Sequence, residues 1–461
     1  MISIDPNESW AVTEFADAQL NDERRTKRLV EIATLLAQQP KASFPEACSD
    51  KAMLKATYRF FDNAAIDPKE IFDSHVTATS DRITDCPLIL AVQDTTDLNF
   101  THHPKTVDLG PVSGKNQQGL LAHTTVAMTP ERVPLGLLAQ QVWARDKNDV
   151  GKSARRKTRP IDQKESHKWL TSLQAVIEVS GAHPNTHFVS VGDTEADVYD
   201  LFIEKRPKNV DLLVRAAWNR RVSHPEQYLW SKVCVQPIAG AIIVDIPRRG
   251  KQPARQARLE VRFTSVWLCP PRYRKAEKLP RQKVWAVLAT EPNPPEGIAP
   301  IEWLLLTTCP VATIEQAIER IDWYACRWGI EVLHKVLKSG CRIESRQLGT
   351  ASRLLRCLSV FSVVAWRILY ATMLSRALPN APCEAILAPE EWQALYCRIH
   401  QTATLPPEMP TLRQAVDWIA RLGGFLGRRS DGDPGVTVLW KGFQHLTHLT
   451  AMYCILRSPP D

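Results

Sequence analysis

The sequence predicts a mixed α/β fold with helical segments at both ends of the chain. Between residues 88 and 217, short apolar runs typical of buried strands alternate with helical segments, which is the pattern of a mixed sheet. Helical periodicity dominates residues 1–70 and 411–457 instead. The 461 residues correspond to about three domains at ~150 residues each. A hydrophobic content of 44% and a charged content of 23% exclude disordered, collagen-like and coiled-coil proteins.

These patterns predict three domains. Residues 1–70 form a helical domain, residues 71–370 form a mixed-sheet core, and residues 371–461 form a second helical domain. The core is interrupted at about 218–300 by a segment rich in Pro, Arg and β-forming residues. We expect this segment to be a β-rich insertion without helices.

The first domain is predicted to contain two amphipathic helices. One lies within residues 20–39 and has Asn21 or Asp22 as its N-cap. The other lies near residues 49–63, where basic residues stand beside an apolar face. Such helices suit a small DNA-binding bundle, and a plain helical cap on the next domain is the alternative.

The core and the C-terminal part are predicted element by element from apolar periodicity. Strands are expected at residues 87–93 (ending at Asp94), 119–128, 132–143, 187–192 (ending at Asp193), 211–217 and 303–308. Helices are expected at residues 163–181, 195–205, 351–376 and, as one long helix ended by Gly340, 311–340. Prolines in 377–410 indicate a loop or short helices, and RRSDGDPG (428–435) indicates a turn.

The cysteines and the N-terminus indicate an intracellular protein. The 11 cysteines are an odd number without C-x-x-C spacing, as expected of reduced cytosolic thiols. The first residues are polar and acidic, unlike a secretory signal. No apolar run approaches the ~20 residues that span a bilayer. We therefore expect a cytoplasmic protein with no membrane partner.

Positive charge is concentrated in one segment. The whole chain has a net charge of +8, but residues 215–283 contain 16 basic and four acidic residues and therefore carry +12. Such a concentration suggests a polyanionic partner, most often nucleic acid, and a solvated surface is the alternative. A second basic run comprises Lys152, Arg155, Arg156, Lys157 and Arg159. It is expected to be an exposed loop that contacts either phosphate or solvent only.

Two aspartates stand at the ends of predicted buried strands, Asp94 in LAVQDTTD and Asp193 in VSVGDTEAD. A carboxylate at the end of a central strand is costly to desolvate unless a cation compensates it, and metal ions would do so. The alternative is that both are turn or helix-capping residues, a role that the neighbouring Thr95 and Glu195 would fit.

The long predicted helix carries a polar stripe made of Tyr324, Arg327, Glu331 and Lys338. At about 100° per residue, these side chains fall within an arc of about 60°. The apolar face lies to the side and comprises Trp323, Ile330, Leu333 and Leu337. A surface stripe with an Arg327–Glu331 pair, worth a few tenths of a kcal/mol, is the alternative.

Together, Asp94, Asp193 and Glu331 offer the oxygen ligands that Mg²⁺ or Mn²⁺ prefers. Two such ions would activate a water or a 3′-hydroxyl on one side of a phosphodiester and stabilise the leaving oxygen on the other. The flanking side chains of Tyr324, Arg327 and Lys338 would hold phosphates beside the ions, since phosphoryl transfer needs mainly positioning and charge.

At these residues the sequence resembles bacterial DDE transposases of the insertion-sequence-four family, in its transposon-five branch. The helix motif Y-x2-R-x3-E-x6-K of that family matches Tyr324, Arg327, Glu331 and Lys338 with every spacing kept. The D-T-T context of the first acid matches Asp94, and the D-x-E-A-D context of the second matches Asp193. Other similar stretches are D-x-R-R-x-x-R-L, Y-R-F-F, K-E-S-x-K-W (164–169), W-L-L-L-T (303–307) and residues 422–446.

The resemblance implies a ribonuclease-H-like catalytic core, with a β-strand insertion before the third acid. It implies an N-terminal domain that recognises transposon-end inverted repeats and a C-terminal domain that forms a homodimer in the synaptic complex. The enzyme would nick each end, excise the element through a hairpin, and join the 3′ ends to target DNA. The implied location is the bacterial cytoplasm, in association with the nucleoid.

The resemblance also implies residue roles. Asp94, Asp193 and Glu331 match the metal-binding triad for two Mg²⁺ or Mn²⁺ ions per active site. Residues implied to contact DNA are Tyr324, Arg327, Lys338, Arg215, Trp303, Arg24, Arg28 and Arg59. Trp303 would fill the gap left by a flipped base, and core packing is its alternative role.

Four further residues near the triad are expected to be structural. The nearby acids Asp97, Glu195 and Asp197 are expected to support the site rather than to bind metal, and His123 to be a hydrogen-bonded core histidine. Two other functions remain open, namely a metal-dependent nuclease of the same fold and a catalytically silent or domesticated DNA-binding protein.

Overall fold

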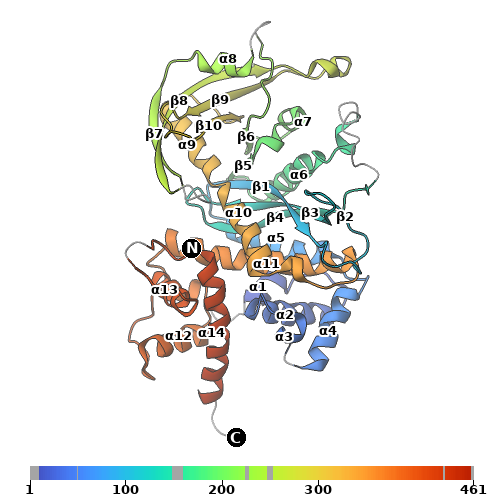
Figure 1. Ribbon diagram of the computed structural model, residues 1–461, viewed down its shortest axis with the longest axis vertical. Helices are drawn as coiled ribbons and strands as arrows, with labels where there is room; N and C mark the ends of the chain where they lie inside the picture. Colours follow the sequence, from blue (N-terminus) through green and yellow to red (C-terminus); the bar gives the residue numbers. More distant parts are fainter. Residues whose placement is uncertain are drawn as a thin grey trace. The chain divides into compact units, whose positions relative to one another are not determined.

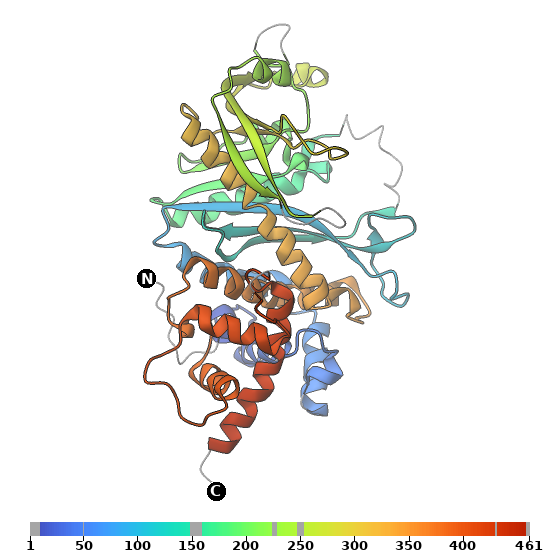
Figure 2. The ribbon, with the colours of Figure 1, turned by 60° about the vertical axis from the view of Figure 1, so that its left-hand side comes forward.

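The strand β1 (Leu88–Asn99) contributes to both of the compact units into which the chain folds in this computed structural model. The structure describes residues 10–48, 50–147, 159–223, 228–246, 253–428 and 431–457 (Figures 1 and 2). The ranges that form unit 1 are Met1–Asp85, Thr95–Gly151 and Gly329–Asp461. Unit 2 comprises Cys86–Asp94 and Lys152–Trp328.

Unit 2 is built on a mixed sheet in the order β1-β5-β6-β10-β9-β8-β7 (Figure 1). The start of β1 pairs in parallel with β5, and β5 pairs in parallel with β6, whereas the pairs from β6 through β10 to β7 are antiparallel. The other strand bounds are β5 (His187–Gly192), β6 (Val210–Arg215), β7 (Gly240–Ile246), β8 (Arg255–Leu268), β9 (Gln282–Thr290) and β10 (Glu302–Thr307).

The parallel strands are central because both of their faces are covered. Phe188, Val189, Val191, Leu212 and Leu213 have no exposed surface, as expected of parallel strands that read as continuous apolar runs. The helices α6 (His167–Ala182) and α9 (Ile314–Ala325) both pack on β5 and β6. The predicted strands 187–192, 211–217 and 303–308 and the predicted helix 163–181 are therefore confirmed within a few residues.

The β-rich insertion is confirmed by β7, β8 and β9, which extend the sheet of unit 2 beyond β10. The expectation that the segment has no helix is wrong, because α8 (Leu229–Cys234) and the 3-10 helix η5 (Arg272–Glu277) lie within it. Leu229 and Val233 of α8 are fully buried, so two apolar positions suffice to anchor this short helix. Such a short element leaves no helical periodicity that a sequence pattern can detect.

Unit 1 contains β2 (Gly110–Pro111), β3 (Gln118–Met128) and β4 (Pro134–Trp143), and β3 pairs antiparallel with β4. The helices α5 (Pro68–Ile83) and α11 (Ala351–Ala377) pack on β4. The close approach of α5 requires a glycine, because a Cβ at Gly136 would lie 1.9 Å from Oγ1 of Thr79. The strands 119–128 and 132–143 are confirmed, whereas α5 was not predicted.

The N-terminal part of unit 1 is helical, as predicted. Its helices are α1 (Trp10–Phe15), α2 (Glu23–Gln38), α3 (Phe44–Ala47) and α4 (Lys51–Asp62). The N-cap of α2 is Asp22 rather than Asn21, because the Asp22 carboxylate accepts a hydrogen bond from the amide of Arg24. Asn21 instead adopts a left-handed backbone conformation, with φ at 59°.

Two buried arginines of unit 1 tie this N-terminal part to the segments around α11. Arg346 donates to the carbonyls of Pro40 (2.5 Å) and Ala42, and its guanidinium lies 4.4 Å from the centroid of the Phe361 ring. Arg356 on α11 donates to the carbonyl of Ile66 at 2.6 Å. Charge-assisted hydrogen bonds of this kind satisfy loop carbonyls that no secondary structure pairs.

The C-terminal helices are α12 (Pro389–His400), α13 (Leu412–Leu422) and α14 (Val436–Arg457), and both α12 and α13 pack on α14 (Figure 2). The turn at 428–435 is confirmed for its described residues. A Cβ at Gly423 would lie 1.8 Å from the Val438 carbonyl oxygen, so glycine permits the contact of α13 with α14. Among the described helices, α11 alone is long and apolar enough to cross a membrane, and 89% of its apolar window is buried inside the protein, as in a core helix.

The predicted single helix over 311–340 is wrong. α9 ends at Ala325, α10 (Trp328–Lys335) follows, and a π-helical turn, η6 (Val336–Gly340), completes the segment. The break arises where the Arg327 amide bonds to the Tyr324 carbonyl at 3.1 Å, a tighter pattern than the α-helical one. Residues 311–328 contain no Pro or Gly that would signal the break. Because of the break, the ideal rotation of about 100° per residue does not hold across residues 311–340.

Two further boundaries differ from the sequence prediction. β1 does not end at Asp94 but continues to Asn99. The helix expected at 195–205 is divided into a 3-10 turn, η4 (Thr194–Ala196), and the short α7 (Tyr199–Ile203). The remaining 3-10 turns are η3 (Ile161–Gln163), η7 (Ile343–Ser345) and η8 (Cys383–Ala385). The domain boundaries at 70 and 370 stay predictions.

Candidate functional site

Asp94 and Asp193 occupy matching positions on two neighbouring parallel strands of unit 2. The register places Leu88 opposite His187 and Val92 opposite Val191. Continued by two residues, the same offset brings Asp94 opposite Asp193. Since side chains alternate along a strand with a period of two, both carboxylates project to the same face as Val92 and Val191. The two predicted acids therefore follow the last paired residues of β1 and β5, Asp94 within β1 and Asp193 directly after β5.

The register extends the row to a basic residue. β5 and β6 pair with Gly192 opposite Val214, so Asp193 is opposite Arg215 at the end of β6. The guanidinium of Arg215 donates to the carbonyl of Glu302 at 3.0 Å, which ties it to β10. Asp94, Asp193 and Arg215 thus form what we call the strand-end row, with two anions and one cation at one edge of the sheet.

Asp193 begins a tight turn that fixes its position. Its Oδ1 accepts a hydrogen bond of 2.8 Å from the amide of Glu195, so Asp193 caps η4, as the capping alternative anticipated. A Cβ at Gly192 would lie 2.4 Å from the Cβ of Ala196, so a glycine before the aspartate lets this turn close. Capping uses one oxygen of the carboxylate, and the residue remains half-buried.

Burial raises the pKa of the Asp193 carboxyl above its ordinary value, and the nearby carboxylate of Glu195 raises it further. The hydrogen bond from the Glu195 amide and the charges of Arg327 and Lys168 lower it, without compensating fully. An additional cation beside Asp193 would therefore stabilise its ionised form.

Arg327 lies over the two acids of unit 2. Its Nη1 is 3.7 Å from Oδ2 of Asp94, and both side chains are largely shielded, with 17% and 19% of their surface exposed. Its charge also lowers the pKa of Asp193. The structure therefore brings together three of the predicted site residues, Asp94, Asp193 and Arg327.

Lys168 is a residue of this site that the sequence analysis did not single out. It lies on α6, only 7% of its side chain is exposed, and its Nζ donates to Oε2 of Glu195 at 2.9 Å. The available signal was the K-E-S-x-K-W stretch, noted only as a similarity. The ion pair explains Glu195 as a residue that supports the turn after Asp193.

Tyr324 and Trp303 contact each other. Their ring centroids are 5.9 Å apart and the rings meet edge to face at 63°. Tyr324 is 6% exposed, so the surface-stripe alternative is wrong for this residue. Trp303 is half-buried on β10, two residues from Leu305, which is paired with Arg215. Packing against Tyr324 therefore accounts for part of the burial of Trp303.

Glu331 and Lys338 belong to unit 1. Glu331 lies on α10, four residues after Arg327 along the chain, and is half-buried. Lys338 lies in the π-helical turn η6 and is also half-buried.

The predicted basic residues of the N-terminal helices lie on the surface of unit 1. Arg24 pairs with Asp22 at 3.2 Å, and Arg28 pairs with Glu31 at 2.7 Å. Arg59 is exposed on α4 and lines a shallow depression of about 450 Å³. Its other lining residues include Lys51, Lys55, Tyr58 and Arg353. The depression therefore has an excess of basic residues and one exposed aromatic ring, although its one acid, Asp62, forms an ion pair with Arg353.

Three of the four residues expected to be structural make the contacts that this role requires. Asp97 accepts from the amide of Ser113 at 2.9 Å. Asp197 is buried and accepts from the amides of Ala217 and Trp218. In unit 1, His123 is fully buried, with its Nδ1 2.9 Å from the Thr95 hydroxyl.

The basic segment 215–283 is less positive at its surface than its sequence suggests. Ion pairs join Arg220 to Asp197, Arg255 to Glu291, and Arg274 to both Asp200 and Glu277. Arg248, Arg249 and Lys251 lie outside the described residues, as do Lys152, Arg155, Arg156 and Lys157 of the second basic run. Composition alone therefore overstates the free positive charge of the described part.

Comparison with known families identifies both ends of the chain. Residues 7–66 match the transposase DNA-binding family. Residues 363–458 match the transposase Tn5 dimerisation domain. The two matches support a Tn5-like transposase that binds DNA and forms a homodimer, and such domains imply an enzyme that cleaves and transfers DNA. The α4 residues that line the depression lie within the first match.

Proposed function

We propose that this chain is a cut-and-paste DNA transposase of the DDE class, in the insertion-sequence-four family, with a ribonuclease-H-like core. The observation that carries the proposal is the strand-end row of Asp94, Asp193 and Arg215, with Arg327 beside Asp94. The same chain that carries these two carboxylates also contains segments that match a transposase DNA-binding family and a transposase dimerisation domain.

The donor set fits divalent cations. Carboxylate oxygens are the ligands that Mg²⁺ and Mn²⁺ prefer, and Asp94 and Asp193 project them to one face of the sheet. The raised pKa of Asp193 indicates that its anion lacks full compensation. Glu331 is proposed as the third carboxylate on the strength of the Y-x2-R-x3-E-x6-K motif. Two ions held there would supply an activated oxygen nucleophile and charge stabilisation of the leaving oxygen.

The side chains around the acids would position the DNA. Arg327 and Lys338 are proposed to bind phosphates beside the scissile bond, since phosphoryl transfer depends mainly on positioning and charge. The Tyr324 hydroxyl would donate to a phosphate oxygen. Arg215 and Trp303, tied to the same end of the sheet through Glu302, would hold the strand that folds back into the hairpin. The exposed side of the Trp303 ring would stack in place of a flipped base.

The end domains would select and pair the DNA. Arg24, Arg28 and Arg59 are proposed to contact transposon-end inverted repeats, and residues 363–458 to hold two ends in one homodimer. Excised 3′ ends would then join target DNA. The proposed location is the bacterial cytoplasm, in association with the nucleoid.

A cleavage assay on labelled duplexes tests this function. The substrates carry the terminal inverted repeats that flank the gene, and the products are separated on a denaturing gel. Wild-type protein with Mg²⁺ is expected to nick at the repeat boundary and to form a hairpin, and Glu331→Ala to do neither. Glu178→Ala, at an exposed acid on α6, is the control and keeps both activities.

Two outcomes would contradict the proposal. End binding without cleavage by the wild type would indicate a silent DNA-binding protein. Cleavage without end preference or hairpins would indicate a nuclease of the same fold.

A further inference from the structure

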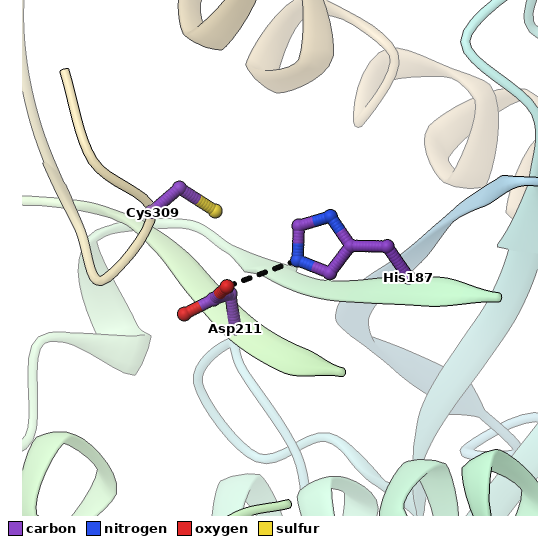
Figure 3. A group of neighbouring side chains, drawn as sticks. All are labelled: His187, Asp211 and Cys309. Carbon is purple, nitrogen blue, oxygen red and sulfur yellow. Dashed lines mark hydrogen bonds and ion pairs between the residues drawn. The ribbon is translucent and has the colours of Figure 1, made fainter. Parts of the chain in front are cut away.

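Unit 2 contains a second cluster of potential ligand side chains at the other end of β5 from Asp193. His187 is the first residue of β5, Asp211 lies near the start of β6, and Cys309 follows β10 (Figure 3). One ligand atom of each lies within 4.8 Å of the other two. At about 3.3 Å per residue, the six residues from His187 to Asp193 span roughly 20 Å. The cluster is therefore separate from the strand-end row.

The carboxylate at the centre of the cluster is oriented by its neighbours. Oδ2 of Asp211 is 2.9 Å from Nε2 of His187, a contact drawn as a dashed line in Figure 3. Oδ1 accepts a hydrogen bond of 2.5 Å from the hydroxyl of Thr308, which itself accepts from the amide of Leu212 at 2.9 Å. One carboxylate oxygen is thus held by the backbone of β6 through Thr308, and the other faces His187. Ligand carboxylates in metal sites are oriented by hydrogen bonds of this kind.

The backbone that carries Cys309 is equally fixed. Its amide donates to the Thr307 hydroxyl at 3.1 Å, and that hydroxyl donates to the Leu212 carbonyl at 2.7 Å. Cys309 is 1% exposed, whereas the side chains of His187 and Asp211 are 36% and 23% exposed. An ion can therefore enter from the side of His187 and Asp211, with the sulfur at the closed end.

The arrangement does not suit a cysteine nucleophile. Burial and the negative charge of Asp211 together raise the pKa of the Cys309 thiol to about 12. An activated thiol would need the imidazole beside it and a lowered pKa, but here His187 is hydrogen-bonded to the carboxylate. A bound metal ion is the agent that would make a thiolate stable at this position.

We propose that His187, Asp211 and Cys309 bind a transition-metal ion of the Zn²⁺ class, with a water molecule as the fourth ligand. Imidazole, carboxylate and thiolate are the three ligand types that zinc accepts. Zinc–ligand bonds of about 2.0–2.3 Å in a tetrahedron place ligand atoms roughly 3.3–3.7 Å apart. The His187–Asp211 hydrogen bond at 2.9 Å would open by less than about 1 Å to admit the ion.

The protons and charges of this binding step balance. The thiol of Cys309 releases one proton to solvent, and the imidazole of His187 shifts its proton to Nδ1 so that Nε2 becomes the ligand. One carboxylate and one thiolate neutralise the doubly charged ion. Arg206 and Arg320 interact electrostatically with Cys309, and Arg206 with Asp211 as well, which stabilises the two anions.

Metal binding would join three segments of unit 2. The ligands come from β5, from β6 and from the segment that leads from β10 into α9, which starts five residues after Cys309. α9 carries Tyr324, and Arg327 lies two residues beyond the end of α9. The ion is therefore expected to act structurally by fixing the start of α9 against the two parallel strands.

Titration of the full chain with Co²⁺ tests the site. Cobalt replaces zinc in such sites, and a bound thiolate gives a charge-transfer absorption in the near ultraviolet. One saturable equivalent is expected for the wild type and for Cys234→Ser, which alters an exposed cysteine outside the cluster. The band is expected to be absent in Cys309→Ser and to be displaced by Zn²⁺ but not by Mg²⁺. A wild type without the band, or a Cys309→Ser variant that retains it, overturns the proposal.

A second variant guards against loss of the fold in Cys309→Ser. His187→Ala alters a partly exposed side chain, and circular dichroism verifies that the variant is folded. The affinity for Co²⁺ is expected to fall ~10-fold or more. The rise in Tm that Zn²⁺ causes in the wild type is expected to disappear. Unchanged affinity and an unchanged rise in Tm in folded His187→Ala contradict the site.

Discussion

At the scale of single residues, the strand-end row explains why these side chains were conspicuous in the sequence. Asp94 and Asp193 interrupt apolar runs, so a pattern of residues is enough to mark them. Their alignment with Arg215 follows from two strand registers that link residues about 100 and about 20 positions apart. No local pattern encodes such a register, because it is set by which strands become neighbours.

Arg327→Ala is expected to reduce metal-dependent end cleavage by about 100-fold or more, the usual effect of removing a group that stabilises developing charge. Binding of end DNA is expected to remain, because the residues matched to the DNA-binding family lie at 7–66. Single-turnover cleavage and gel-shift titration measure the two effects. Lys208→Ala is the control and leaves cleavage unchanged, since Lys208 is an exposed cation in the turn before β6, at the other end of that strand from Arg215. Equal loss of binding and cleavage in Arg327→Ala would count against a role at the scissile phosphate.

At the scale of elements, unit 1 contains a buried polar junction between α1, α5 and β4. Nε2 of His75 accepts from the amide of Leu137 at 3.0 Å, so Nδ1 carries the proton and donates to Glu14 at 2.5 Å. Arg82 donates to the same carboxylate at 2.7 Å. Burial lowers the pKa of His75, because the charged imidazolium would be desolvated. A proton on Nε2 would also face the amide donor of Leu137. Interactions with His75 and Arg82 outweigh burial and lower the pKa of Glu14.

This junction predicts that stability declines in mild acid. The folded state keeps His75 neutral, whereas the unfolded chain binds a proton at this residue below about pH 6.5. The free energy of unfolding therefore falls by up to about 1.4 kcal/mol for each pH unit below that value. The lowered pKa of Glu14 adds a further loss at more acidic pH, in the same direction. Thermal unfolding from pH 8 to pH 5 measures the decline, which His75→Gln is expected to reduce. His102→Gln alters an exposed histidine and should leave the pH dependence as it is; equal slopes in both variants would refute this account.

The contact of α5 with β4 gives another prediction at this scale. Gly136→Ala is expected to destabilise the protein by about 1–3 kcal/mol, because its Cβ would collide with Thr79 and the two elements would have to separate. Gly181→Ala is the matched control, since a Cβ there meets nothing within 4 Å and alanine favours the helix α6. Chemical denaturation measures both. A neutral Gly136→Ala would show that α5 approaches β4 less closely.

The elements also show where sequence reasoning was sufficient. β5 was predicted at its observed bounds because Phe188, Val189 and Val191 form a short strand-type run between turn residues. α5 was missed because its polar residues outnumber its apolar ones and leave only a weak helical period. The break between α9 and α10 was missed because it depends on one tightened hydrogen bond, at Arg327, and not on a helix-breaking residue.

At the scale of the whole molecule, the two family matches fit a division of labour along the chain. DNA recognition is assigned to residues 7–66 and dimerisation to residues 363–458. The end of α14 exposes apolar side chains, with Met452 at 56%, Ile455 at 67% and Leu456 at 78%. Exposed apolar residues grouped on one helix end are typical of an interface.

Charge placed in that group is expected to disrupt the dimer. Ile455→Glu combined with Leu456→Glu should weaken dimerisation on end DNA by at least ~10-fold, because each carboxylate would be desolvated in the interface. Sedimentation velocity with end duplex measures the species. Val235→Glu, at another exposed apolar position, is the control and stays dimeric. A double variant that dimerises like the wild type would place the interface elsewhere.

The most direct test of the central claim is a titration of the protein–end-DNA complex with Mn²⁺, followed by electron paramagnetic resonance. The wild type and the control Glu178→Gln are expected to bind two ions per protomer, and Asp193→Asn is expected to lose tight binding of at least one. The complex of Asp193→Asn should still form, because its DNA-binding residues are unchanged. Equal Mn²⁺ binding by Asp193→Asn and the wild type would contradict a metal-binding role for the strand-end row.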